Sequence, residues 1–286
     1  MRNSHLFSEE LLLKKRPKIG VFDSGMGGFS VLKSLIKKSP YCDFVYIGDT
    51  ANFPYGMKSK EQIISCTHNA VNFLLKKDVE SVIIGCHTAS IFTMNQMEKS
   101  FSIPLFFMVP AACLEALRVS KKRVIAVIGT KATVQSDEYS RYLKSYDRNI
   151  HVKSRDCPLL IEFAERGSID IPLVRKVVKN YLEDFVTSEV DTLILGCTHF
   201  SIFRDLIRQE VGEHVNLVDP VYSVSDEIVN KYGIQSLDDR FSLDVYVTNG
   251  DLEYYLDRVY KLFVGMEVDL KIKKIILDEK NVYQYT

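Results

Sequence analysis

The sequence lacks an excess of charge of either sign, and it lacks a long apolar run. Its 286 residues carry 37 Lys plus Arg and 37 Asp plus Glu, so the formal net charge is zero. Because phosphate binding needs a basic excess or a dense basic stripe, this balance argues against nucleic acid as the main partner. No segment approaches the roughly 18 apolar residues of a membrane-spanning helix, so we expect no membrane partner either.

The beginning of the chain also lacks the pattern of a signal peptide. In residues 1–18, Glu9 and Glu10 interrupt the apolar stretch, and the basic cluster follows that stretch. The six cysteines are scattered and include no CxxC pair, which would have suggested a zinc ribbon or a redox motif. These absences predict a cytoplasmic protein with free thiols.

Strand-like and helix-like segments alternate along the chain. The apolar segment 18–23 precedes helical spacing over 31–39, and a second strand-like segment, 43–50, precedes a helical segment at 61–77. This alternation is typical of βαβ units and a parallel sheet, in which ligands bind at the carboxyl ends of the strands. At roughly 150 residues per domain, the length suggests two domains or one large one.

An internal repeat supports two domains. The segment VESVIIGCHTAS at 79–90 matches VDTLILGCTHFS at 190–201 in Val, Ile, Gly, Cys and Ser, with four further conservative positions. We therefore expect an α/β protein of two pseudo-symmetric domains, each a mainly parallel sheet flanked by helices, with the active site in the cleft between them. Pro110 and Pro220 mark the expected crossings. The first domain would span 1–110 and be completed by 222–286, and the second would span 111–221.

The glycine-rich segment DSGMGG at 23–28 allows three interpretations. A phosphate cradle is one, but the dinucleotide fingerprint needs a third glycine where Ser30 stands, and Asp23 would repel a phosphate. A tight strand–helix turn with glycines at positive φ is the second. The third is a small-molecule site in which Asp23 and Ser24 bind a polar substrate.

The two copies of the repeat each place one cysteine just after a buried strand. Cys86 begins the segment Cys-His-Thr, and Cys197 begins the segment Cys-Thr-His. Backbone N–H groups and a nearby histidine are expected to lower a thiol pKa from about 8.5 toward neutrality. Two opposed thiols suit a reaction that removes a proton from one face of a carbon and delivers another to the opposite face. That reaction is racemisation by general acid–base catalysis.

At this point the chain resembles the glutamate racemases over about residues 18–277. The resemblance is carried by motifs in order: FDSGMGG (22–28), GDTANFPYG (48–56), GCHTAS (85–90), IGTKAT (128–133), CPLLIEFAERG (157–167) and LGCTHF (195–200). Aspartate racemases resemble the chain in the cysteine loops but usually carry Glu where His199 stands. Hydantoin racemases share only the strand–Cys pattern and lack the PYG loop.

The resemblance implies roles for individual residues. Cys86 and Cys197 correspond to the acid–base cysteines, Asp23 to the carboxylate that assists the first, His199 to the imidazole that assists the second, and Glu165 to an acidic residue near the second. The substrate's carboxylates and ammonium would be bound by Asp23, Ser24, Pro54, Tyr55, Gly56, His87, Thr88, Thr130, Thr133 and Thr198. No metal, pyridoxal phosphate or nicotinamide is implied. The family supplies D-glutamate for peptidoglycan and often forms homodimers.

His87 departs from the family, which normally has Asn after the first cysteine. A protonated His87 would stabilise the Cys86 thiolate and bind a carboxylate, whereas a neutral one would crowd the pocket. We expect obstruction, because a cation beside Asp23 would be drawn to that carboxylate. The second cysteine loop also continues with Phe200 and Ser201, where the family usually has an aromatic residue followed by Pro.

Two other classes of function remain open. One is a degenerate relative that binds an amino acid or a partner protein with little or no turnover. The other is a metal-binding protein that uses Cys86, His87, Cys197 and His199 as ligands. Two loops separated by the width of a substrate would hold these ligands too far apart for one tetrahedral site.

Overall fold

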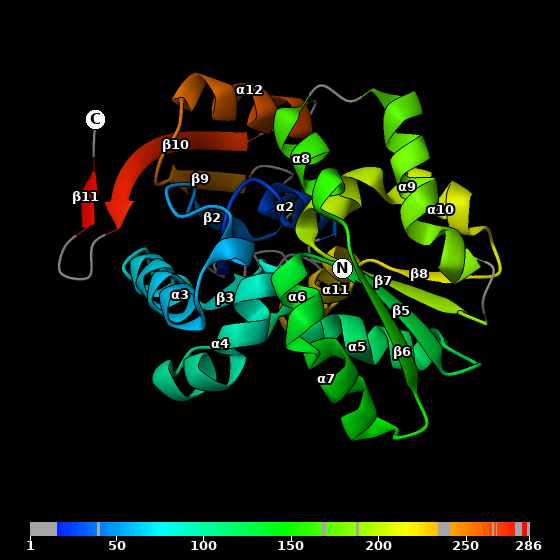
Figure 1. Cartoon of the computed structure of the whole chain (residues 1–286). Helices are drawn as coiled ribbons and strands as arrows, with labels where there is room; N and C mark the ends of the chain where they lie inside the picture. Colours follow the sequence, from blue (N-terminus) through cyan, green and yellow to red (C-terminus); the bar gives the residue numbers. More distant parts are fainter. Residues whose placement is uncertain are drawn as a thin grey trace, which may run out of the picture.

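The computed structural model describes residues 16–38, 41–167, 170–186, 189–233, 241–264, 266, 268–277 and 282–284. Residues 1–15, in which we find no signal peptide pattern, lie outside this part. Within the described ranges, no helix is both long and apolar enough to cross a bilayer. Figure 1 shows two sheets with helices packed around each of them.

The larger sheet has seven strands in the order β11-β10-β9-β2-β1-β3-β4. All neighbouring strands pair in parallel except β10 and β11. Side chains of β1 alternate between two cores: Ile19 and Val21 pack in the core with α2 and α11, and Phe22 packs in the core with α3 and α4. The strands span Lys18–Asp23 (β1), Asp43–Gly48 (β2), Ser81–Ile84 (β3), Leu105–Phe107 (β4), Phe241–Val247 (β9), Val268–Leu277 (β10) and Val282–Gln284 (β11).

The smaller sheet has four parallel strands in the order β6-β5-β7-β8. Its inner strand β5 also faces two cores. Ile128 packs in the core with α8, α9 and α10, whereas Ile125 and Val127 pack in the core with α5 and α7. The strands span Val124–Gly129 (β5), His151–Asp156 (β6), Thr192–Gly196 (β7) and Asn216–Val218 (β8).

The helices cover both faces of each sheet, as buried strands require. In the described part they are α2 (Gly28–Lys38), α3 (Lys60–Leu75), α4 (His87–Ser100), α5 (Met108–Val119), α6 (Lys131–Ser136), α7 (Glu138–Tyr146), α8 (Pro158–Arg166), α9 (Ile171–Val186), α10 (Arg204–Val211), α11 (Pro220–Tyr232) and α12 (Leu252–Leu262), with short 3₁₀ helices η1 (Tyr55–Met57) and η2 (Thr198–Phe203).

The expected α/β class with two mainly parallel sheets is confirmed, and the segment after residue 222 returns to the first sheet as β9 and β10. The exact domain boundaries at 110 and 222 stay a prediction. Pro110 lies in the first turn of α5 and Pro220 is the first residue of α11. Both prolines occupy helix starts, where their missing N–H breaks no intrahelical hydrogen bond.

Candidate active site

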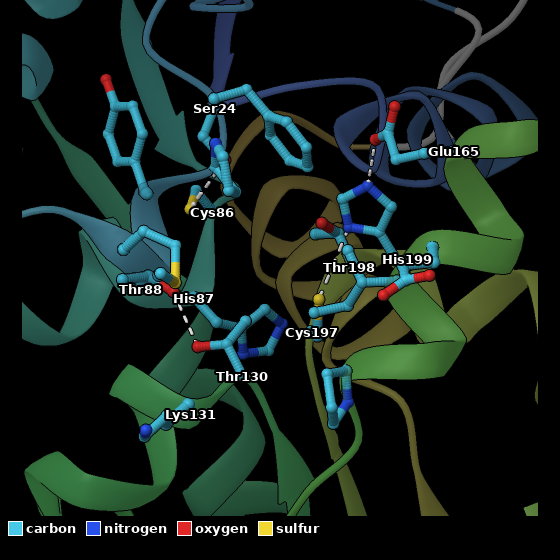
Figure 2. Close-up of a pocket in the computed structure, with 18 residues that line it drawn as sticks. Ser24, Cys86, His87, Thr88, Thr130, Lys131, Glu165, Cys197, Thr198 and His199 are labelled. Atoms are coloured by element: carbon cyan, nitrogen blue, oxygen red, sulfur yellow. Dashed lines mark hydrogen bonds and ion pairs between the residues drawn. The ribbon is translucent and has the colours of Figure 1, made fainter.

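A cavity of about 350 Å³ lies where the carboxyl ends of strands from both sheets face each other. Figure 2 shows residues of the two cysteine loops on its wall, together with residues of α6 and α8. Twelve residues named from the sequence line it: Ser24, Pro54, Tyr55, Gly56, Cys86, His87, Thr88, Thr130, Glu165, Cys197, Thr198 and His199. Asp23 and Thr133 were also named, but they are buried behind this wall.

The repeat explains why the two cysteines occupy equivalent positions. Cys86 follows β3 and forms the N-cap of α4, whereas Cys197 follows β7 and forms the N-cap of η2. β3 pairs with β1 in the large sheet, and β7 pairs with β5 in the small one. Each cysteine therefore follows a strand that pairs with the first strand of its half, β1 or β5.

Cys86 is a buried, neutral thiol. Its sulfur lies 3.3 Å from Ser24 Oγ. Burial, reinforced by the nearby charge of Asp23, raises the pKa of Cys86 to about 12. The expectation of a lowered pKa is thus wrong for this cysteine, because loss of hydration outweighs the hydrogen bonds from Ser24 and the main chain of Ala89.

Asp23 lies between the two halves of the site. Its Oδ1 accepts a hydrogen bond from the Gly25 N–H at 2.9 Å, and its Oδ2 accepts one from Thr198 Oγ1 at 3.2 Å. Burial raises the pKa of Asp23, while the charge of His199 opposes this rise. The carboxylate therefore joins the glycine-rich loop at 23–28 to the second cysteine loop.

The second cysteine ends a chain of three interacting groups. Cys197 Sγ lies 3.5 Å from His199 Nδ1, and His199 Nε2 lies 2.5 Å from Glu165 Oε1. Burial alone would lower the pKa of His199, but Cys197 and Glu165 raise it well above its ordinary value. His199 is accordingly an imidazolium at neutral pH, with the Cys197 sulfur beside one ring nitrogen and the Glu165 carboxyl beside the other. Figure 2 shows this chain crossing from α8 to the second cysteine loop.

The glycine-rich loop packs closely against the second cysteine loop. A Cβ on Gly27 would lie 2.2 Å from Thr198 Oγ1, so a glycine is required where the loop meets the second cysteine loop. None of the described glycines Gly25, Gly27 and Gly28 has a positive φ, so the turn interpretation based on left-handed glycines is wrong. Ser24 lines the cavity, which agrees with the small-molecule interpretation.

Hydroxyl groups line the cavity opposite the His199 chain. Thr88 Oγ1 lies 3.2 Å from Thr130 Oγ1, and Thr130 Oγ1 is 3.0 Å from Thr133 Oγ1. Thr133 thus supports Thr130 from behind. Tyr55 lines the cavity as well, but its hydroxyl donates to Asp49 Oδ2 at 2.7 Å.

Six further residues line the cavity that the sequence did not single out: Phe53, Met57, Lys131, Pro158, Ile161 and Glu162. All except Met57 fall inside the six motifs quoted above, and Met57 follows the PYG segment directly. Their position within the motifs was the available signal.

Comparison with known proteins places this site in a family. The family model described as Asp/Glu/Hydantoin racemase matches residues 31–224. A glutamate racemase from Aquifex aeolicus (strain VF5) is 40% identical over 259 residues, covering 89% of this chain and 97% of that protein. The chain belongs to the Asp/Glu/Hydantoin racemase family. It is accordingly an isomerase of the amino-acid racemase class, as the motifs implied.

Solved structures resemble the racemase over nearly its whole length. The crystal structure of glutamate racemase isoform RacE1 from Bacillus anthracis has a TM-score of 0.81 and 30% identity, covering 91% of this chain and 98% of that one. A glutamate racemase from Francisella tularensis subsp. tularensis SCHU S4, crystallised with D-glutamate, has a TM-score of 0.79 and 30% identity, covering 92% and 98%. These matches confirm the fold.

His87 is neutral in the racemase. Burial lowers its pKa to about 3, so the alternative of a cationic His87 is wrong. Nδ1 lies 2.7 Å from the hydroxyl of Tyr139 on α7, whereas Asp23 accepts hydrogen bonds from Gly25 and Thr198. Nε2 is buried and has no hydrogen-bond partner in the described part of the chain. The ring thus occupies the cavity wall without an ionic role.

Replacing His87 by asparagine should therefore increase activity. The shorter amide frees space beside Cys86 and offers both a donor and an acceptor. We expect kcat/KM for glutamate to rise about tenfold, which corresponds to ~1.4 kcal/mol of transition-state stabilisation. Steady-state kinetics measures this, with His68→Asn on α3 as the control. Equal or lower activity of His87→Asn would rule out obstruction.

Replacing Asp23 by asparagine should increase stability at neutral pH. The pKa of Asp23 is higher in the folded than in the unfolded chain. Its stabilising contribution is therefore full below the unfolded value near 3.8 and is lost as the pH rises through the folded value. An asparagine at this position would carry no charge to bury and could still accept a hydrogen bond from the Gly25 N–H.

Thermal denaturation tests this expectation. At pH 7 the melting temperature of Asp23→Asn should exceed that of the wild type by about 2–4 °C for each kcal/mol gained in the free energy of unfolding. The difference in melting temperature should shrink toward pH 4. Asp205→Asn is the control, because the Asp205 side chain is 97% exposed. A lower melting temperature for Asp23→Asn at pH 7 would contradict the burial argument.

Proposed function

We propose that the protein interconverts L- and D-glutamate by two-base proton transfer at Cα, with Cys86 and Cys197 on opposite faces of the substrate. The observation that carries this proposal is the pair of cysteine loops on one cavity, with Asp23 acting on Cys86 through its charge and Glu165 contacting the His199 that lies beside Cys197. The names of the relatives, which are glutamate racemases, support glutamate as the substrate. The Francisella relative crystallised with D-glutamate supports it further.

The two thiols lie in different surroundings. The imidazolium of His199 lies 3.5 Å from Cys197, whereas Cys86 is buried and is a thiol. The proposed reaction needs one base and one acid at rest, and we assign Cys197 as the base and Cys86 as the acid. Cys197 would remove the α-proton of L-glutamate while Cys86 delivers its proton to the opposite face, leaving D-glutamate and the two sulfurs with exchanged protonation. In the reverse direction, Cys86 would remove the α-proton of D-glutamate.

The carbanion formed in between needs stabilisation at the α-carboxylate. Thr88 lies in the first turn of α4, next to Thr130, so hydroxyls and main-chain N–H groups of a helix start gather on this side. We infer that they bind the α-carboxylate. By the family's pattern, the product D-glutamate would supply peptidoglycan synthesis in the cytoplasm, and the enzyme would form a homodimer.

Circular dichroism of glutamate incubated with the purified protein tests the function. L- and D-glutamate should each approach the racemic mixture, whereas aspartate should change little. The outcome that contradicts the proposal is an unchanged signal for both glutamate enantiomers. Calorimetric binding of glutamate without turnover would favour a degenerate relative instead.

The metal-binding alternative is tested separately. In the parts of the chain with described coordinates, no group of three or more His, Cys, Asp or Glu side chains is arranged to hold a metal ion. Stoichiometric zinc in protein purified without added metal would favour that alternative.

A further inference from the structure

Two side chains of α12 bind the main chain at the end of α8. Tyr254 Oη donates to the main-chain oxygen of Glu165 at 2.8 Å, and Arg258 Nη2 donates to the same oxygen at 3.3 Å. α12 follows β9 of the large sheet, whereas α8 packs on the small one. Figure 1 shows α12 and α8 side by side, where the two halves meet. We call Glu165, Gly167, Tyr254 and Arg258 the interdomain clasp.

The local sequence explains why this contact forms. Glu165 lies in the last turn of α8, where carbonyl oxygens lack intrahelical partners and a cation is favourable. The Arg258 guanidinium also lies over the Tyr254 ring at 4.2 Å, so the two donors form one unit. Gly167 ends α8 with a φ of +72°, and a Cβ there would lie 2.0 Å from Arg258 Nη2. Glycine adopts this φ without strain and leaves room for the guanidinium.

The clasp acts on the residue that contacts His199. The Glu165 side chain is 28% exposed, so burial alone does not fix its carboxylate. Its main-chain oxygen, by contrast, is bound twice from α12. The direction in which the carboxylate leaves the helix therefore depends on the clasp.

We propose that Tyr254 and Arg258 are positioning residues of the racemase: they fix the main chain of Glu165, so that its carboxylate stays on His199 and supports proton transfer by Cys197. This inference rests on the proposed function. The clasp also joins the half that carries Cys86 to the half that carries Cys197, so contact between the two halves bears on the position of Glu165.

The charged groups around His199 determine what the clasp can change. Cys197 faces Nδ1, Glu165 faces Nε2, and Asp23 interacts with the ring through its charge. Displacing Glu165 removes one of these three groups from contact with the imidazole and leaves the other two. The imidazolium should then lose its proton at a lower pH than in the wild type.

Conservative variants of the clasp test the proposal. Tyr254→Phe removes one donor and keeps the ring, and Arg258→Met removes the other. Since a misplacement of ~1 Å can cost a hundredfold, we expect kcat with L-glutamate to fall about tenfold in each variant, with KM changed by less than about twofold. Tyr260→Phe, on the same helix and 59% exposed, is the matched control and should behave as the wild type.

Two further measurements separate positioning from a merely structural role. In a Glu165→Gln background, Tyr254→Phe should reduce kcat little further, because the group it positions is already lost. In substrate-free protein, an NMR titration of His199 should show a lower midpoint in Tyr254→Phe than in the wild type.

Several results would overturn the proposal. They are an unchanged kcat in both clasp variants, an effect of Tyr254→Phe that is undiminished in the Glu165→Gln background, or an unchanged His199 midpoint. If the wild type does not racemise glutamate, the proposed function is wrong. The titration, which needs no substrate, still decides whether the clasp positions Glu165.

Discussion

Replacing either cysteine by alanine should reduce racemisation of glutamate about a thousandfold or more, because one of the two proton-transferring groups is then missing. In each single variant, exchange of the α-hydrogen with solvent should be lost for one glutamate enantiomer only. Cys86→Ala retains Cys197, which still removes the α-proton of L-glutamate, exchanges it with solvent and returns a deuteron to the same face. Cys197→Ala should retain exchange of D-glutamate alone. Proton NMR of each enantiomer in heavy water measures both results.

Cys113→Ala is the matched control for these variants. Cys113 is a free, fully buried thiol of α5 that does not line the cavity. Its loss should leave racemisation and both exchange reactions close to the wild-type rates. Retention of exchange for both enantiomers in Cys86→Ala would show that the two thiols do not serve opposite faces.

Replacing His199 by glutamine should lower kcat/KM for L-glutamate about a hundredfold. The imidazolium lies 3.5 Å from Cys197 and supplies a positive charge beside the sulfur that removes the proton, a charge that glutamine lacks. Because Cys197 and Glu165 raise the pKa of His199, the wild type should lose activity at alkaline pH, where the imidazolium gives up its proton. That alkaline limb of the kcat/KM profile should be absent from His199→Gln, and Glu165→Gln should move it to lower pH, because His199 then loses one of the groups that raise its pKa.

The pH profile of kcat/KM measures this shift, with His68→Gln on α3 as the control. His68 lies outside the cavity and bonds Asn72 on its own helix. An alkaline limb that stays at its wild-type position in His199→Gln would contradict the role assigned to the imidazolium.

The features that repeat within the sequence could be predicted from it. The two cysteine loops were predicted because matching buried strands end at Cys86 and Cys197. Short or exposed strands could not be predicted in this way. Strand β6 has the sequence HVKSRD and most of its side chains are exposed, so apolar and polar residues do not alternate along it. Glu165 has no local signal of its own, and only the family resemblance pointed to it.

Properties that depend on tertiary contacts were predicted less well. The pKa of Cys86 is set by burial and by Asp23, 63 positions earlier in the chain, whereas the sequence suggested only the effect of its immediate neighbours. The hydrogen bond between His87 and Tyr139 joins residues 52 positions apart. The contact of α12 with Glu165 spans 89 positions for Tyr254. No periodicity or motif indicates such pairs.

The most direct test of the two-base reaction follows deuterium during a single conversion. L-Glutamate is incubated with the wild-type protein in heavy water, and both enantiomers are separated after less than a tenth of the substrate has reacted. If Cys197 removes the proton and Cys86 supplies another, the D-glutamate formed carries deuterium at Cα while the remaining L-glutamate is still almost entirely unlabelled. D-glutamate that retains the original hydrogen would contradict the account, because a single group would then have carried the proton from one face to the other.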